Sequence, residues 1–308
     1  MSPSTRSPAN YQGLILFTAL LCVFAVSAGA QPPSNHSGFP SLNSTQQAEM
    51  LLLNEKFDAA IQAYQKLWEE DGENNYAVRG LVRAYWAAGR AHDLENYLDG
   101  ILSHHPNSSS ARYGLGFLFY LDKRFYESEK ILREVLAQDP KNALALNNLG
   151  AVLVHLKSLP EAVEEVKKAI AIHPSELMFY RNLYGIYANG GRAESFLKEY
   201  QTHLKNGERQ TAFGYGSVFA QSLRQRSFRL YAEGDVPGAI QKIMAMVDIY
   251  REIDHASGRV AGLFSLGLLY EEQGELERAR EYYRNLLKIN PDHIQAREKI
   301  RQFDINKK

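Results

Sequence analysis

The chain of 308 residues is long enough for one or two ordinary domains or for one continuous array of repeats. Hydrophobic residues make up 45% of it, so most of the chain is expected to fold. Its 35 basic residues are balanced by 35 acidic ones, which argues against a nucleic-acid-binding protein because such proteins carry a strongly basic face.

Residues 1–30 have the pattern of a signal peptide. Residues 14–26 form an uncharged apolar core, Arg6 adds positive charge before it, and Ala28 and Ala30 give the small-x-small pattern that signal peptidase requires. The core is shorter than the roughly 20 residues of a membrane-spanning helix. We therefore expect cleavage before Gln31 and an exported protein, periplasmic or extracellular, with no membrane span after the signal is removed.

The single cysteine, Cys22, lies within this apolar core. Its removal with the signal would exclude a disulfide framework and a thiolate metal site in the mature protein. Two alternatives stay open. One is an uncleaved signal anchor. The other is lipidation of Cys22, which Leu21 disfavours because a small residue is needed there. Residues 31–40, rich in proline, serine and glycine, are expected to form a flexible lead-in.

The next part of the chain repeats itself at a 34-residue interval. Three prolines at this spacing, Pro106, Pro140 and Pro174, each follow an apolar-periodic stretch. Because proline cannot continue a helix, each marks the end of the second helix (helix B) of a helical hairpin. Counting back from them places end-to-end repeats at 41–74, 75–108, 109–142 and 143–176.

Apolar and small residues recur at fixed positions of this frame. The eighth position, where the first helix (helix A) must approach its partner closely, holds Ala48, Val82, Gly116 and Gly150. The twentieth position, the matching crossing point on helix B, holds Ala60, Leu94, Ser128 and Ala162. Agreement at several positions across four repeats indicates stacked hairpins with one continuous buried face.

The clearest repeat lies near the C-terminus. Residues 265–291 resemble the tetratricopeptide repeat (TPR), with Gly267, Tyr270, Gly274, Ala279, Tyr283 and Pro291 at the signature positions of that family. The repeat covers 260–293, and a longer unit at 220–259 precedes it. Residues 177–210 form a degenerate repeat with Tyr184 and Phe196 where small residues belong, so this hairpin is expected to be splayed.

Two segments fall outside the repeats. Residues 211–219 break the frame and contain Gly214 and Gly216, which predicts an irregular join between an N-terminal block at 41–210 and a C-terminal block at 220–293. Residues 294–308 place Ala296, Ile300 and Phe303 at helical spacing, which is typical of a capping helix that covers the last repeat.

The family resemblance implies an all-α fold, a right-handed superhelical solenoid of antiparallel hairpins with about seven repeats and a C-terminal capping helix. It also implies that the protein is a non-catalytic scaffold that holds a partner protein or an extended peptide in its concave groove. The export signal places that scaffold in the cell envelope. The alternatives are an accessory or regulatory subunit of an envelope enzyme or of a secretion or polysaccharide machine, and an enzyme with an unrecognised site.

Helix A of each repeat is expected to line the groove. Aromatic and arginine side chains are the usual anchors of protein interfaces, and the groove positions of two repeats hold seven of them: Tyr76, Arg79, Arg83, Trp86, Tyr113, Phe117 and Tyr120. The alternative is that these aromatic rings pack against neighbouring hairpins.

Polar groove positions lie in the next two repeats. Asn148 and Asn182 resemble the asparagine ladder by which some tetratricopeptide grooves hold a peptide backbone, and Asn147 and Arg181 precede them. The family's lysine clamp for chaperone tails is not met. His104 and His105 are adjacent, so they point apart on a helix and do not form a metal pair. No catalytic motif is present, and we expect no cofactor, no metal and no catalytic residue.

Overall fold

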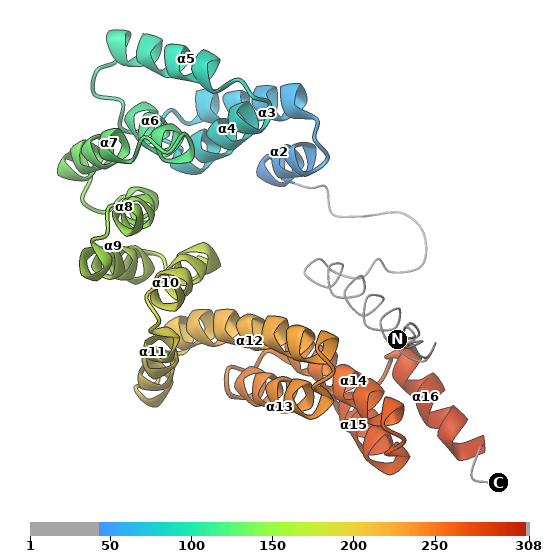
Figure 1. Cartoon of the computed structure of the whole chain (residues 1–308). Helices are drawn as coiled ribbons and strands as arrows, with labels where there is room; N and C mark the ends of the chain where they lie inside the picture. Colours follow the sequence, from blue (N-terminus) through green and yellow to red (C-terminus); the bar gives the residue numbers. More distant parts are fainter. Residues whose placement is uncertain (1–42, 306–308) are drawn as a thin grey trace, which may run out of the picture. The chain divides into compact units, whose positions relative to one another are not determined.

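The computed structural model describes residues 43–305, which form fifteen helices and no strand (Figure 1). The prediction of an all-α fold is confirmed. The expected signal peptide at 1–30, with Cys22, and the expected lead-in at 31–40 lie outside the described residues.

The helices form seven successive hairpins followed by one more helix, as expected. The five predicted repeats between 41 and 210 each contain one hairpin, whereas α12 and α14 begin before the units predicted at 220–259 and 260–293, so those two starts are wrong. The pairs are α2 (Ser44–Leu53) with α3 (Phe57–Glu70), α4 (Asn75–Ala87) with α5 (Ala91–His104), α6 (Ser109–Leu121) with α7 (Phe125–Gln138), α8 (Ala143–His155) with α9 (Leu159–Ile172), α10 (Leu177–Asn189) with α11 (Ala193–Lys205), α12 (Arg209–Ala232) with α13 (Val236–Glu252), and α14 (Ala256–Glu272) with α15 (Leu276–Ile289). The additional helix is α16 (Ile294–Ile305).

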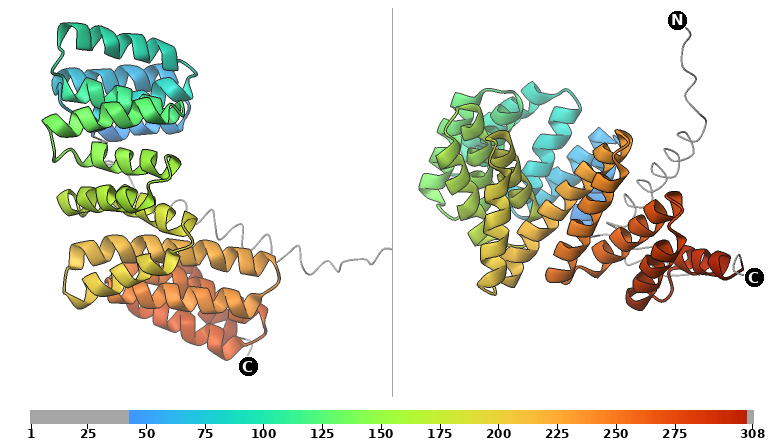
Figure 2. Two further views of the ribbon diagram at one scale, coloured as in Figure 1. Left: turned by 60° about the vertical axis from the view of Figure 1, so that its left-hand side comes forward. Right: turned by 60° about the horizontal axis from the view of Figure 1, so that its bottom comes forward.

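The chain divides into two compact units, one that ends at Lys198 and one that begins at Glu199. In the N-terminal unit, helix A of each hairpin contacts helix A of the next, in the order α2, α4, α6, α8 and α10. In the C-terminal unit, α12 to α16 each contact their neighbour in the chain, and Figure 2 shows these helices side by side. No helix between residues 43 and 305 combines the length and the apolar character that crossing a bilayer needs.

The loops explain why the helices begin and end where they do. Asn74, Ser108 and Asn142 each precede a helix A, and their side chains accept a hydrogen bond from the backbone N–H three residues later. The loops that contain Pro106 and Pro140 lead into two of these caps. The sequence-based placement of the helix B ends at these prolines is therefore correct.

Close packing at the eighth repeat position depends on small residues. A Cβ atom at Gly116 would lie 2.9 Å from Leu132, and one at Gly150 would lie 3.0 Å from the carbonyl oxygen of Ala162. These glycines let α6 approach α7 and let α8 approach α9. In the degenerate hairpin, Tyr184 and Phe196 instead meet edge to face, with their centroids 5.2 Å apart. The two rings fill positions that small residues occupy in several of the other hairpins.

The prediction of an irregular join at 211–219 is wrong, because these residues lie inside α12. The predicted break was inferred from Gly214 and Gly216, which are both buried in this helix. A Cβ atom at Gly216 would lie 2.8 Å from Tyr200 and 2.9 Å from Ile253. This glycine therefore serves close packing, which offsets its cost of about 1 kcal/mol to the helix. The boundary between the two units lies within α11 instead.

Candidate functional site

Four of the predicted site residues lie along one face of α4. Tyr76, Arg79, Arg83 and Trp86 follow the spacing i, i+3, i+7 and i+10, so they form a stripe on this helix. Tyr76 is 46% exposed and Trp86 is 48% exposed, which confirms that these two aromatic side chains reach the surface of the protein.

Arg83 is held by a partner from the preceding repeat. Its two terminal nitrogens donate hydrogen bonds to the two carboxylate oxygens of Glu49, each at 3.0 Å. The hydroxyl of Tyr64 donates to the same carboxylate at 2.6 Å. Burial alone would raise the pKa of Glu49, but the hydrogen bonds from Arg83 and Tyr64 outweigh it and leave this pKa below its usual value. Arg83, which was expected to contact a partner, is therefore paired with a carboxylate of the chain itself.

Substitution of Arg83 by glutamine is expected to cost less than about 1 kcal/mol of stability at neutral pH, because the pair is about one third exposed. Because folding lowers the pKa of Glu49, the ion pair stabilises the fold fully at a pH above 4.5, the pKa of this carboxyl in the unfolded chain. The stabilisation is lost as the pH falls through the lower pKa of Glu49 in the folded protein. Urea denaturation of Arg83→Gln and wild type should therefore differ at pH 7 and converge in acid. In a Glu49→Gln background, Arg83→Gln should show no such pH dependence, and a difference that persists there would contradict this account.

Tyr113 and Phe117 are buried, so the expectation that they are exposed on a groove is wrong. Tyr113 is 0% exposed and Phe117 is 4% exposed, and their rings lie nearly parallel with centroids 6.4 Å apart. The guanidinium of Arg79 covers the Phe117 ring at 5.1 Å. Burial raises the pKa of Tyr113 well above its usual value. These rings belong to the core between α4, α6 and α8, which was the alternative reading of the sequence.

Tyr120 is half-buried, and its ring lies nearly parallel to that of Phe117, with centroids 6.4 Å apart. Its ring lies 6.2 Å from Phe125 and 6.0 Å from His155, and the last two rings stack at 4.1 Å. Burial raises the pKa of Tyr120. These contacts join the end of α6 to the start of α7 and the end of α8, and Phe117 links Tyr120 to Arg79 of the α4 stripe.

The asparagines bond to one another and to Tyr113. The amide of Asn148 donates to the Tyr113 hydroxyl at 3.1 Å, and the amide of Asn182 donates to the side-chain oxygen of Asn147 at 2.8 Å. Asn147 and Asn148 are buried, and a longer contact of 3.4 Å joins their side chains. The expectations that Asn148 holds a peptide backbone and that Asn147 contacts the partner are therefore wrong, because their polar atoms face the interior.

Two polar members of the predicted set on α10 also remain accessible. Asn182 is partly exposed at the end of the amide chain, and Arg181 beside it is exposed. Glu176, at the start of the same hairpin, influences the pKa of Tyr76. Burial is the main reason that this pKa is raised, the negative charge of Glu176 raises it further, and the positive charge of Arg79 lowers it. We name Tyr76, Arg79, Trp86, Arg181 and Asn182 the helix A surface.

Sequence reasoning missed Glu49, although a signal for it was present. Glu49 and Arg83 are 34 residues apart, and the bonded pairs Tyr113–Asn148 and Asn147–Asn182 are each 35 apart. Residues one repeat apart lie on neighbouring helices A, so the period predicts such partners directly. Within residues 43–305 no group of histidine, cysteine, aspartate and glutamate side chains could hold a metal ion.

Three segments match models of the tetratricopeptide repeat: 51–115, 123–176 and 260–293. No curated protein matches the chain.

Several solved structures are similar to parts of the chain. The crystal structure of MamA is 23% identical with a TM-score of 0.37, and the match covers 53% of this chain and 95% of that one. A thermophilic TPR protein of Thermus thermophilus, TTC0263, is 18% identical with a TM-score of 0.42, and the match covers 57% of this chain and 97% of that one. The crystal structure of the APC/C hetero-tetramer Cut9-Hcn1 is 14% identical with a TM-score of 0.46, and the match covers 84% of this chain and 55% of that one.

Proposed function

We propose that this chain, which is a tetratricopeptide-repeat protein, is a non-catalytic scaffold of the cell envelope that binds an extended segment of a partner protein. Repeats of this kind are protein–protein interaction modules. The proposed binding site is the helix A surface of the N-terminal unit. The proposed location rests on the signal pattern of residues 1–30.

The observation that carries this proposal is the exposure of Tyr76 and Trp86 on one helix face. Each leaves nearly half of a large aromatic side chain in water, 46% and 48% respectively. Exposed apolar surface of this kind is typical of interaction sites, and tyrosine and tryptophan are enriched among the residues that dominate binding energy. Arg181 and Asn182 add polar groups that can donate hydrogen bonds to a peptide backbone or an acidic side chain.

The core behind the surface supports the same proposal. Tyr113, Phe117 and the bonded asparagines fill the space between α4, α6, α8 and α10. Such a bonded core fixes the positions of the neighbouring helices A before a partner arrives, and a preformed site loses less entropy on binding. The buried residues of the predicted set therefore position the site, and the exposed ones contact the partner.

The double substitution Tyr76→Ala and Trp86→Ala is expected to weaken partner binding by at least about thirtyfold, since truncation of one central anchor typically costs about 2 kcal/mol. Both side chains are half exposed, so the fold should persist. The measurement is the amount of each protein that co-purifies with the full chain from its host. Tyr126→Ala is the matched control, because Tyr126 is 78% exposed on a helix B. Equal capture by the double variant and the wild type would show that the partner uses another surface.

Export is tested separately. We expect N-terminal sequencing of the mature protein from its host to begin at Gln31, because Ala28 and Ala30 provide the cleavage pattern. A mature protein that still contains Cys22 would contradict a cleaved signal and favour the signal anchor or the lipidated form.

A further inference from the structure

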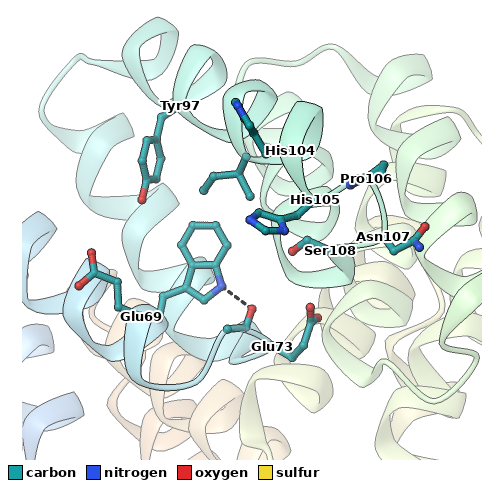
Figure 3. A pocket seen from close by; sticks show the side chains of 11 residues that line it. Glu69, Glu73, Tyr97, His104, His105, Pro106, Asn107 and Ser108 are labelled. Atoms are coloured by element: carbon teal, nitrogen blue, oxygen red, sulfur yellow. Dashed lines mark hydrogen bonds between the residues drawn. The ribbon is translucent and has the colours of Figure 1, made fainter.

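A pocket of about 740 Å³ lies between α3 and α5, the second helices of the first two hairpins. It is lined by residues near the ends of these helices and in the loops that follow them (Figure 3). None of the helix A surface residues lines it. The pocket is therefore a separate feature of the N-terminal unit that the proposed function does not use. Its volume falls within the range of about 300–1,000 Å³ that is typical of small-ligand sites.

Two aromatic rings form the apolar wall of the pocket. Trp68 and Tyr97 meet edge to face, with ring centroids 6.3 Å apart and an interplanar angle of 77°. The indole N–H of Trp68 donates to the carbonyl oxygen of Gly72 at 2.7 Å and to the hydroxyl of Ser110 at 3.0 Å. Because this donor is already used and Trp68 is 6% exposed, the indole presents only a small part of its apolar ring to the pocket. Ile101 of α5 extends the wall.

The charged groups of the pocket are acidic. Glu69 and Glu73 line it, and no lysine or arginine of the described part of the chain does. Glu73 accepts a hydrogen bond from the backbone N–H of Ser110 at 3.0 Å. Glu69 has no hydrogen bond or ion pair among the described residues. The pKa of Tyr97 is raised, first by the burial of its own ring and then by the negative charge of Glu69. In Figure 3, Tyr97 and Glu69 lie on one side of the pocket, and His104 and His105 lie on the other.

We infer that this pocket binds an organic cation on an alkyl stem, carried as an arginine or lysine side chain of a partner polypeptide. An aromatic ring face attracts a guanidinium or ammonium group, and the two carboxylates add charge complementarity. The charged head would lie over the Tyr97 ring near Glu69 and Glu73, while the alkyl stem packs against Ile101. The choice of a polypeptide as the carrier rests on the proposed scaffold function, whereas the preference for a cation rests on the pocket alone.

The test uses the fluorescence of Trp68 in the full chain. The protein contains two tryptophans, so Trp86→Phe leaves Trp68 as the single reporter. This variant is titrated with an acetylated and amidated Gly-Arg-Gly peptide and with the same peptide carrying citrulline, which has the shape of arginine without its charge. Isothermal titration calorimetry provides a second measurement. We expect the arginine peptide to bind about tenfold more tightly than the citrulline peptide. The attraction between a desolvated cation and an aromatic ring face changes the affinity by about this factor.

Variants of the pocket locate the binding. Glu69→Gln should weaken the arginine peptide about two- to fivefold, the usual range for an exposed charge pair. Glu70→Gln is the matched control, because Glu70 is the next residue of α3 and does not line the pocket. Its carboxylate oxygen lies 4.0 Å from the Nζ atom of Lys66. Tyr97→Phe keeps the ring and should retain binding, whereas Tyr97→Leu should weaken it about fivefold. Far-ultraviolet circular dichroism confirms that each variant is folded.

Each outcome decides the inference. Equal affinity for the arginine and citrulline peptides, or no saturable signal from either method, overturns it. Propylguanidinium, a free compound with the single charge of the arginine side chain, separates the two sources of the cation. Tighter binding of the peptide than of propylguanidinium supports a polypeptide carrier, and tighter binding of propylguanidinium keeps the cation site but overturns that carrier. The Trp68 signal does not depend on the helix A surface, so failure of this inference and failure of the proposed function are distinguishable.

Discussion

Tyr113→Ala is expected to lower the free energy of unfolding by about 3–5 kcal/mol, the range for truncation of a large buried aromatic ring. Tyr113 is fully buried, its ring lies alongside Phe117, and its hydroxyl accepts the amide of Asn148. The substitution removes the ring from the core between neighbouring helices A and leaves a buried amide without its acceptor. Urea denaturation followed by far-ultraviolet circular dichroism, which reports the helical content, measures the change.

Two controls separate the causes of this loss. Tyr113→Phe keeps the ring and removes only the hydroxyl, so it should cost about 1–3 kcal/mol through the unsatisfied amide of Asn148. Tyr126→Ala truncates a tyrosine that is 78% exposed and should change stability by less than about 0.5 kcal/mol. If Tyr113→Ala unfolds at the same urea concentration as wild type, the ring is not part of the core.

Gly150→Leu is expected to destabilise the protein by about 3 kcal/mol through overpacking. A Cβ atom at Gly150 would clash with Val166 of α9 and lie 3.0 Å from the backbone oxygen of Ala162. Relief would require α8 to move away from α9, because valine has little rotamer freedom in a helix and the backbone oxygen cannot turn aside. Binding of the partner should be lost only as a consequence of unfolding.

Gly185→Ala is the matched control, with an effect of opposite sign. Gly185 also lies within a helix A, but a Cβ atom there would meet nothing within 4 Å. Replacement of a helical glycine by alanine without a clash should stabilise the protein by about 0.5–1 kcal/mol. Urea denaturation of both variants gives the comparison, and destabilisation by Gly185→Ala, or none by Gly150→Leu, would contradict the packing described for the two hairpins.

The hairpin array could be predicted from sequence because its signals are local and repeated. Prolines follow several of the helices B, capping residues precede several of the helices A, and Gly116 and Gly150 mark the close crossings. Repetition at one interval turned several weak signals into one strong prediction. The prediction of an irregular join failed at Gly214 and Gly216. A glycine that breaks an isolated helix cannot be distinguished in the sequence from one that makes room for a neighbouring side chain.

The exposure of the groove residues could not be predicted in the same way. Exposure depends on how closely neighbouring helices A approach, which the position within one repeat does not specify. A Cβ atom at Gly114 would lie 2.8 Å from Val78, so α6 lies tightly against α4 at this level. The close approach buries Tyr113 and Phe117, whereas Tyr76 and Trp86 near the two ends of α4 stay half exposed.

The central claim is that the helix A surface contacts a partner, and site-specific photo-crosslinking tests it most directly. A benzoylphenylalanine residue is placed at position 76, at position 86 and, as a control, at position 126 in the full chain, and each protein is irradiated in its host. All three positions hold exposed aromatic residues, so the replacement is tolerated equally. We predict one shared crosslinked protein from positions 76 and 86 that is missing from position 126. Crosslinks to that protein from position 126 alone, or from none of the three positions, would contradict the claim.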